Sequence, residues 1–132
     1  MQVLYPNVGS LLGMGLVRTA LVDCTVHLFS NDATLGPGTV VGDLTECTFG
    51  GYAEKTVAAL LPAYIDPLGG ASAQIATVQW DHSGSGTDEL VYGFWVETDG
   101  GDLFLCGKFD EPIPMGSVGD SIPLDVKFNF GR

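Results

Sequence analysis

The chain has 132 residues, of which 45% are hydrophobic and 16% are charged. A single compact domain of this length buries roughly two thirds of its unfolded surface, so neither disulfides nor metals are needed to hold it together. Sixteen acidic residues against five basic ones give a net charge of −11, the wrong sign for neutralising phosphates, so direct nucleic-acid binding is disfavoured.

The first predicted element is a short amphipathic helix between Ser10 and Val22, because apolar residues recur there at three- and four-residue spacing. These apolar residues are Leu11, Met14, Val17 and Leu21. Gly13 and Gly15 each cost about 1 kcal/mol relative to Ala inside a helix, so packing must hold this helix in place. Residues 1–9, ahead of the helix, are expected to form an extended arm.

From residue 24 onward the apolar residues alternate with period two, which predicts seven or eight short strands separated by turns. The predicted strands are 24–29, 39–44, 55–61, 74–80, 89–97, 103–109 and 124–130. Asp99-Gly-Gly101 predicts a hairpin between two of them, because glycine supplies the positive φ that primed turns require. Pro112 and Pro114 are expected to break the chain. The order predicts an all-β fold, a β-sandwich or jelly roll with one short N-terminal helix, in a single domain over 10–132.

The segment 89–97 carries apolar side chains on both faces. Strict alternation places Val91 and Trp95 on one face, and Leu90, Tyr92, Phe94 and Val96 on the other. Such a strand lies in the interior of a sheet or has its second face covered by a neighbouring chain. Because aromatic residues are enriched at interface centres, the predicted protein-interface residues are Trp95 and Phe104, together with Tyr5 and Pro6 of the arm.

No residue pattern predicts catalysis or metal binding. His27 lies in a predicted strand beside Leu28 and is expected to be a surface or interface histidine. Asp81, His82 and Ser83 are adjacent in a predicted flexible loop, which cannot hold the geometry of a catalytic triad. The acidic residues gather at turns without a calcium-loop frame. We therefore expect a protein that is not an enzyme and has no cofactor or metal site.

The three cysteines, Cys24, Cys47 and Cys106, lie far apart and form no C-x-x-C pair, so neither a zinc knuckle nor a disulfide scaffold is predicted. We expect them to be reduced and buried. The apolar stretch from residue 11 to 22 is short, is interrupted by Arg18 and follows no basic residue, so neither a signal peptide nor a membrane span is predicted. Folding in a reducing cytoplasm, with no membrane partner, is the expectation.

Three stretches of the chain resemble, in pattern and order, a group of small tailed-bacteriophage structural proteins. The first is Tyr5-Pro-Asn-Val-Gly-Ser-Leu-Leu. The second runs from Val26-His-Leu-Phe-Ser-Asn-Asp32 into Gly42-Asp-Leu-Thr-Glu-Cys-Thr-Phe-Gly-Gly-Tyr52. The third combines Val91-Tyr-Gly-Phe-Trp-Val with Lys108-Phe-Asp-Glu-Pro112 and Gly119-Asp-Ser-Ile-Pro-Leu. In such proteins the pattern L-F-x-N-D … D-[FL]-T-E-x-x-F-x-G-Y precedes a β-rich second half.

The resemblance implies a non-enzymatic capsid cement or decoration protein, made in the host cytoplasm and located on the virion, that binds and stabilises the major capsid protein lattice. A homo-oligomer is expected, with a trimer favoured because it suits the local threefold positions of an icosahedral shell. The alternative is a tail- or fibre-associated binding module. If that module binds carbohydrate, Trp80, Trp95 and Tyr52 would stack on sugar rings.

Overall fold

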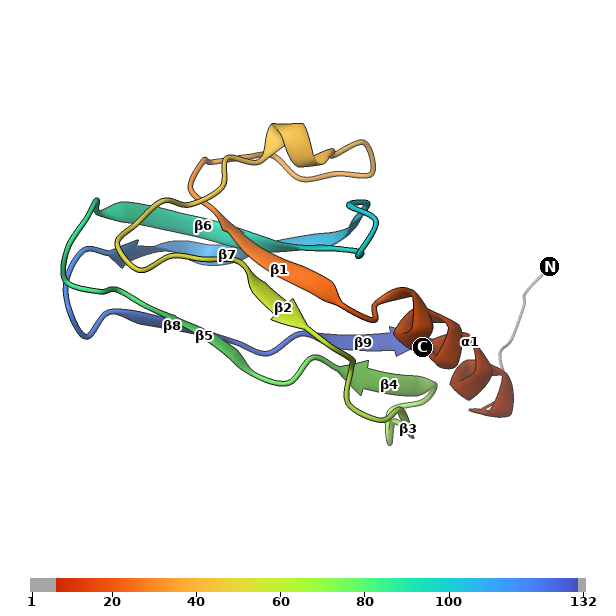
Figure 1. Ribbon diagram of the computed structural model, residues 1–132. Helices are drawn as coiled ribbons and strands as arrows, with labels where there is room; N and C mark the ends of the chain where they lie inside the picture. The colour runs from red at the N-terminus through yellow and green to blue at the C-terminus, as the bar shows by residue number, and fades with distance from the viewer. Residues whose placement is uncertain (1–6, 131–132) are drawn as a thin grey trace.

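A computed structural model describes residues 7–130 of the chain, which form one N-terminal helix and a series of antiparallel strands (Figure 1). The elements are α1 (Asn7–Ala20), β1 (Cys24–Phe29), the 3-10 turn η1 (Val41–Asp43), β2 (Lys55–Val57), β3 (Tyr64–Ile65), β4 (Ala71–Gln74), β5 (Val78–Asp81), β6 (Glu89–Glu97), β7 (Leu103–Met115), β8 (Ser121–Leu124) and β9 (Lys127–Phe130). The predicted all-β class with one short N-terminal helix is confirmed.

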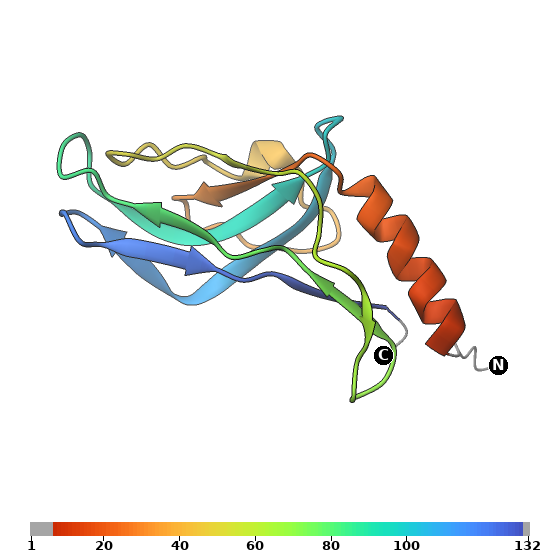
Figure 2. The same ribbon diagram turned by 60° about the horizontal axis from the view of Figure 1, so that its bottom comes forward.

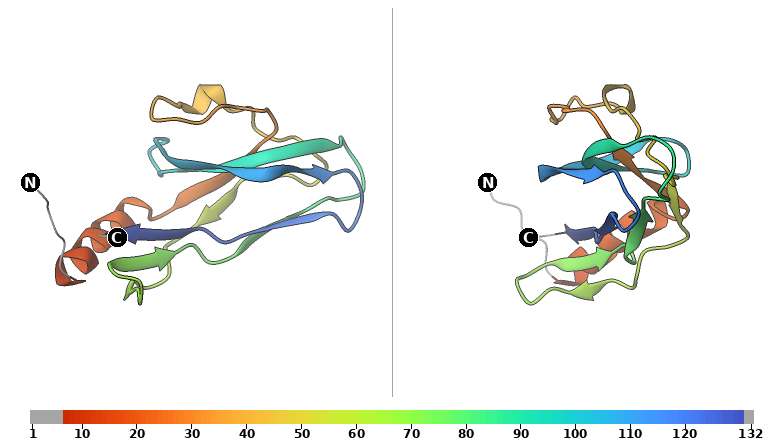
Figure 3. Two further views of the ribbon diagram at one scale, coloured as in Figure 1. Left: turned by 180° about the vertical axis from the view of Figure 1, so that it is seen from behind. Right: turned by 90° about the vertical axis from the view of Figure 1, so that its left-hand side faces the viewer.

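The strands form two layers, which the end-on view of Figure 3 separates. One layer is the sheet β2-β1-β6-β7. The other consists of two smaller sheets, β3-β4-β9 and β5-β8, in which β5 continues the path of β4 and β9 continues that of β8. The main core lies between the layers and takes apolar side chains from both, among them Val26, Leu28, Val91, Trp80, Ile122 and Phe128. The arrangement is sandwich-like, since each layer buries one apolar face against the other.

The helix α1 packs against β3, β4 and β9 at one end of the molecule, where it projects beyond the sheets (Figure 2). Met14 and Leu21 are fully buried and Val17 packs against the core, as the apolar spacing predicts. The helix begins at Asn7, so residues 7–9 of the predicted extended arm are helical. Tyr5 and Pro6, two of the predicted interface residues, lie outside the described residues.

The outer face of β6 is covered by the chain itself. The segment 30–44 folds over this face and forms a second, smaller core with Phe29, Ala33, Leu44 and Trp95. Trp95 is only 2% exposed, so the prediction that it lies at a protein interface is wrong. Trp95 does lie on the opposite face of β6 from Phe94 and Val96, as predicted. A loop of the same chain, not a neighbouring chain, covers that face.

A register shift between Val91 and Gly93 interrupts the alternation that the sequence predicts for β6. After this bulge, Phe94 and Val96 join the main core together with Val91, whereas Tyr92 and Trp95 contact the smaller one. A Cβ atom at Gly93 would lie 2.1 Å from the Gly107 carbonyl oxygen and 2.6 Å from Cζ of Phe29. Only glycine therefore allows this approach of backbone and ring.

Two strands, 24–29 and 89–97, have the predicted bounds. The predicted hairpin is also confirmed, since the Thr98 N–H donates a 2.9 Å hydrogen bond to the Asp102 carbonyl across the turn. The predicted strand 39–44 is wrong, since η1 occupies part of it. The predicted strand 55–61 ends at residue 57, and 74–80 and 124–130 are each divided into two.

Pro112 and Pro114 do not break the chain but lie inside β7. This strand is at the edge of its sheet, where a residue without an N–H costs no ladder hydrogen bond on the open side.

Candidate functional site

The most densely connected polar group surrounds His27, on β1. The predicted surface position is wrong, because the ring is 5% exposed and stacks on Trp95 at 4.6 Å between centroids with an interplanar angle of 5°. β1 lies in the interior of its sheet, and the β1–β6 register places Trp95 directly opposite His27. The same tryptophan that fills the small core therefore covers one face of the imidazole.

Three carboxylates surround the imidazole. Nδ1 lies 2.5 Å from an oxygen of Glu46, and Nε2 lies 2.7 Å from an oxygen of Glu97 and 3.4 Å from one of Glu54. The hydroxyl of Thr25 is 2.8 Å from the same Nε2. Each ring nitrogen therefore lies within hydrogen-bonding distance of a carboxylate oxygen.

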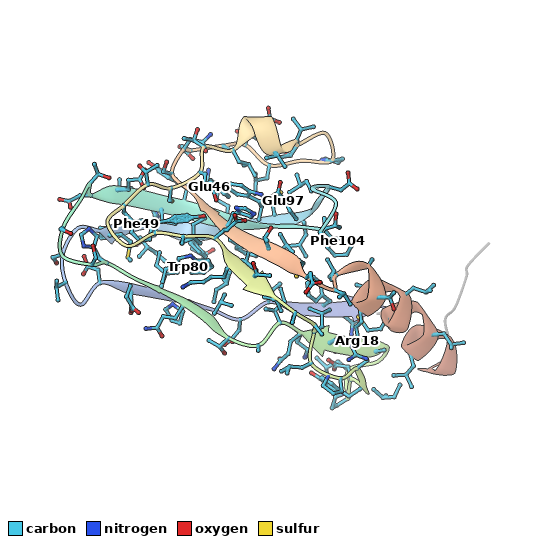
Figure 4. The ribbon with its side chains drawn as sticks, in the orientation of Figure 1. Arg18, Glu46, Phe49, Trp80, Glu97 and Phe104 are labelled. Atoms are coloured by element: carbon cyan, nitrogen blue, oxygen red, sulfur yellow. The ribbon has the colours of Figure 1, made fainter. Side chains whose placement is uncertain are left out.

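The carboxylates come from three different parts of the chain, and Figure 4 shows Glu46 and Glu97 close together above β1. Glu97 ends β6, whereas Glu46 and Glu54 flank the loop that leads into β2. We call His27 with Glu46, Glu54 and Glu97 the His27 cluster.

An open cleft of about 360 Å³ lies beside the cluster and is lined by Glu46, Cys47, Thr48, Tyr52, Ala53 and Glu54. The Tyr52 hydroxyl donates to Glu46 at 2.7 Å and accepts the Leu28 N–H at 3.1 Å. Burial raises the pKa of the Tyr52 hydroxyl. The Leu28 N–H lowers this pKa, and Glu46 raises it further. Burial and the charges of Glu89 and Glu46 raise the pKa of Cys47 to about 12.

The contacts of these groups stabilise the fold and leave few reactive atoms accessible. Both nitrogens of His27 are engaged with carboxylates, so the imidazole has no free atom to present to a substrate. A thiol with a pKa of about 12 is almost entirely protonated at neutral pH and is a poor nucleophile.

No protein-family model, no curated protein and no solved structure matches this chain.

The residues of the pattern L-F-x-N-D … D-[FL]-T-E-x-x-F-x-G-Y, from Leu28 to Tyr52, supply Glu46 to this cluster and form part of its surroundings. The Asn31 side chain bridges the segment 30–45, accepting the Thr45 N–H at 2.8 Å and donating to the Asp43 carbonyl at 2.9 Å. Asp32 forms an ion pair with Lys108 of β7. The Asn31 contacts hold the segment 30–45 together, and the Asp32–Lys108 ion pair fastens it to the first sheet.

The aromatic end of the motif continues this packing. The Phe49 ring stacks on Tyr52 at 5.4 Å and lies 6.2 Å from the ring of His82. Glu46 and Tyr52, which hold His27 and the Leu28 N–H, complete the motif. The pattern L-F-x-N-D … T-E-x-x-F-x-G-Y thus has a structural explanation in this chain.

The second histidine is also buried. Its Nδ1 accepts the Gly84 N–H at 2.9 Å, and its Nε2 lies 3.4 Å from the Thr87 carbonyl. The Ser83 hydroxyl donates to the Ser85 carbonyl at 3.1 Å, whereas the Asp81 carboxylate accepts from Gln79. His82, Ser83 and Asp81 are therefore not brought together as a triad.

The aromatic residues expected to stack on sugars are used inside the protein. Trp80 is fully buried, and its indole N–H donates to the Ala53 carbonyl at 2.8 Å. With Trp95 buried as well, the predicted stacking by Trp80 and Trp95 is wrong. Tyr52 is half-buried and lines the open cleft, so its stacking stays a prediction. Phe104, the remaining described interface candidate, is exposed and meets Phe128 edge-on at 6.0 Å. Its interface role stays a prediction.

Within residues 7–130, no group of three His, Cys, Asp or Glu side chains is arranged to hold a metal ion. The carboxylates of the His27 cluster converge on the imidazole itself. None of the described helices is long and apolar enough to cross a membrane.

Proposed function

We propose that this protein is a non-enzymatic capsid cement or decoration protein of a tailed bacteriophage, which binds and stabilises the lattice of the major capsid protein. The observation that carries the proposal is the resemblance of its three sequence stretches to small phage structural proteins. In the stretch 26–52, the contacts of Glu46 with His27 and of Tyr52 with the Leu28 N–H fasten a long excursion to β1, and Asn31 bridges the excursion internally.

The His27 cluster supports a structural rather than a chemical role. Its imidazole is stacked, buried and engaged at both nitrogens, and its neighbouring tyrosine and cysteine both have raised pKa values. Groups of this kind stabilise one conformation and are poorly suited to exchange protons with a bound substrate.

The charge of the chain supports the same role. A net charge of −11 keeps free protomers apart in the host cytoplasm and weakens nonspecific binding to the acidic genome before assembly. On the shell we expect a homo-oligomer, with the trimer favoured at local threefold positions.

Copy number tests the proposal. Virions of the phage that encodes this chain are purified on a density gradient, and the polypeptide is quantified against the major capsid protein by mass spectrometry. The proposal predicts near-stoichiometric abundance. A few to a few dozen copies would favour the tail- or fibre-associated alternative, and absence from the virion would refute both structural assignments.

A further inference from the structure

Residues 33–44, which we call the lid, form the outer part of a surface loop that leaves the first sheet and returns to it (Figure 1). The two ends of the loop are joined where it meets the sheet. The Ser30 N–H donates to the Thr45 carbonyl at 2.8 Å. The Asn31 side chain accepts the Thr45 N–H and donates to the Asp43 carbonyl. Compact loops with joined ends are Ω-loops, which move as units on the surface of a fold.

Hydrogen bonds of the lid run almost entirely within the loop. The Thr39 N–H, for example, donates to the Gly36 carbonyl at 3.0 Å, and the Gly36 N–H donates to the Thr39 hydroxyl at 2.8 Å. In the part of the chain that the structure describes, one residue beyond the loop bonds to the lid. This residue is Lys108 of β7, whose Nζ donates to the Ala33 carbonyl at 3.1 Å. Apolar contacts and one lysine therefore hold the lid on the sheet.

Lys108 makes its contacts at the edge of the lid. Its ammonium group forms an ion pair with Asp32, the residue before the lid, and lies 6.0 Å from the centroid of the Tyr92 ring. The side chains of Lys108 and Asp32 are 37% and 71% exposed. Because water and salt reach the pair, its contribution is small and falls with ionic strength. The only polar tie between the lid and the sheet in residues 7–130 is thus a weak one.

Trp95 lies beneath the lid in the smaller core, where Leu35 and Val41 of the lid pack against it only partly buried. Its indole Nε1 is buried and has no hydrogen-bond partner among the described residues. A buried donor without an acceptor costs free energy in the closed state, and the cost disappears when water reaches the indole. The closed lid is therefore less stable than its apolar contacts alone would make it.

A hollow of about 340 Å³ separates the tip of the lid from the edge strand β7. It is lined by Gly36, Pro37 and Thr39 of the lid and by Leu103, Phe104, Leu105 and Cys106 of β7. The tip is therefore not packed closely against the strand beside it.

We propose that the lid opens and closes over Trp95 while both layers of the fold stay intact, and that Lys108 is its latch. Opening exposes the apolar surface of the smaller core, and closing covers it again. Segments with few buried contacts open at a lower free energy than the whole fold. This inference concerns the chain by itself and does not depend on the proposed function.

The moving segment ends at Leu44, because the chain that follows is tied directly to β1. The Cys47 N–H donates to the Leu28 carbonyl at 3.0 Å, and Glu46 contacts the imidazole of His27. The His27 cluster therefore stays in place when the lid opens.

Acrylamide quenching of tryptophan fluorescence tests the lid, because the chain has two tryptophans and both are buried. Trp80→Phe leaves Trp95 as the reporter beneath the lid, and Trp95→Phe leaves Trp80 as a reporter in the main core. Lys108→Met removes the latch in either background. The matched control is Lys127→Met. Lys127 also pairs with a carboxylate and lies 5.7 Å from a tyrosine ring centroid, but it belongs to β9 in the other layer.

We expect Lys108→Met to raise the quenching rate of Trp95 roughly fivefold, and Lys127→Met to raise it by less than about twofold. The quenching rate of Trp80 should not change in Lys108→Met. Equal rises in the two lysine variants would refute the latch. An unchanged rate for Trp95, or an equal rise for Trp80, would refute the lid.

Amide hydrogen exchange of the unsubstituted chain is the second measurement, and it requires no tryptophan variant to fold. The N–H groups of Ala33 and Leu44 are bonded inside the loop, and turns this short do not persist once they leave the sheet. We expect both to exchange at least about tenfold faster than the N–H of Cys47. Exchange of all three at one rate would show that the lid opens only with the rest of the fold, and would overturn the proposal.

Salt tests the latch in the same experiment. Between about 0.01 M and 1 M NaCl the Debye length falls from roughly 30 Å to 3 Å, so screening weakens the pair between Lys108 and Asp32. We expect exchange at Ala33 and Leu44 to accelerate over this range while exchange at Cys47 does not. Exchange at Ala33 and Leu44 that is insensitive to salt would contradict the role of Lys108.

Discussion

Single residues in this protein stabilise the fold chiefly by pairing buried polar groups that come from distant parts of the chain. His27 joins carboxylates from the β6 end and from the loop before β2, and Asp66 joins the turn before β4 to Lys127 of β9. Removing the buried partner of such a group costs more than removing an exposed one, because the remaining charge loses its compensation.

Replacement of His27 by Phe tests the His27 cluster. Phe keeps a ring against Trp95 but leaves Glu46 and Glu97 without their shared polar partner, so we expect a loss of about 3 kcal/mol in the free energy of unfolding. The control Glu54→Gln, at a half-exposed carboxylate 3.4 Å from the ring, should change it by at most about 0.5 kcal/mol. Urea denaturation at neutral pH measures both, and equal effects would contradict the central role of the histidine.

The pH dependence of stability should reflect Asp66. The Leu68 N–H, Lys127 and the Ser72 hydroxyl hold the pKa of its carboxyl well below the ordinary range. A carboxyl with a lowered folded-state pKa stabilises the fold above its unfolded pKa of about 4, and the stabilisation is lost as the pH falls toward the folded-state value. We therefore expect Asp66→Asn to flatten the decline of the urea midpoint between about pH 5 and pH 2. Parallel declines in wild type and variant would refute this role.

Thiol reactivity should follow burial. The thiol of Cys106 is only partly buried, whereas Cys24 and Cys47 lie in the core. Burial raises the pKa of all three thiols, that of Cys47 to about 12. During alkylation by iodoacetamide at about pH 8, Cys106 should react first and Cys47 only after unfolding, because the thiolate is the reactive species. Peptide mapping by mass spectrometry gives the order, and early labelling of Cys47 would show that the segment 30–52 opens in the native state.

At the scale of the elements, the sequence predicts what depends on local periodicity and misses what depends on tertiary contacts. The helix and the strands 24–29 and 89–97 follow from apolar spacing. The bulge near Gly93 does not follow from apolar spacing, because it depends on the packing of Phe29. The continuation of β7 through Pro112 does not follow either, because it depends on the position of β7 at the sheet edge.

The His27 cluster was missed for the same reason. A histidine between apolar neighbours in a strand, and a glutamate inside the T-E-x-x-F motif, were both visible in the sequence. Their pairing requires the segment 30–52 to fold back over β1, which no local pattern encodes.

The close approach of β6 and β7 gives an element-scale prediction. In Gly93→Ala the new methyl group would meet the Gly107 carbonyl and the Phe29 ring, so we expect a loss of about 2–3 kcal/mol in the free energy of unfolding. The matched control Gly38→Ala has no atom within 4 Å of the new Cβ and should be neutral or stabilising by up to about 1 kcal/mol. Thermal or urea unfolding compares them, and a stable Gly93→Ala protein would contradict the described packing.

At the scale of the whole molecule, two strand layers enclose the main core, and the segment 30–44 closes a second, smaller core over the first sheet. The chain as a whole has a charge of −11, which opposes association between free copies. The proposed function therefore predicts ordered assembly of this protein on the capsid lattice.

Electron cryomicroscopy of shells assembled from the major capsid protein and mixed with the full chain tests the proposed function most directly. We expect density for the protein at regular lattice positions. Shells without ordered density at saturating protein would contradict the account.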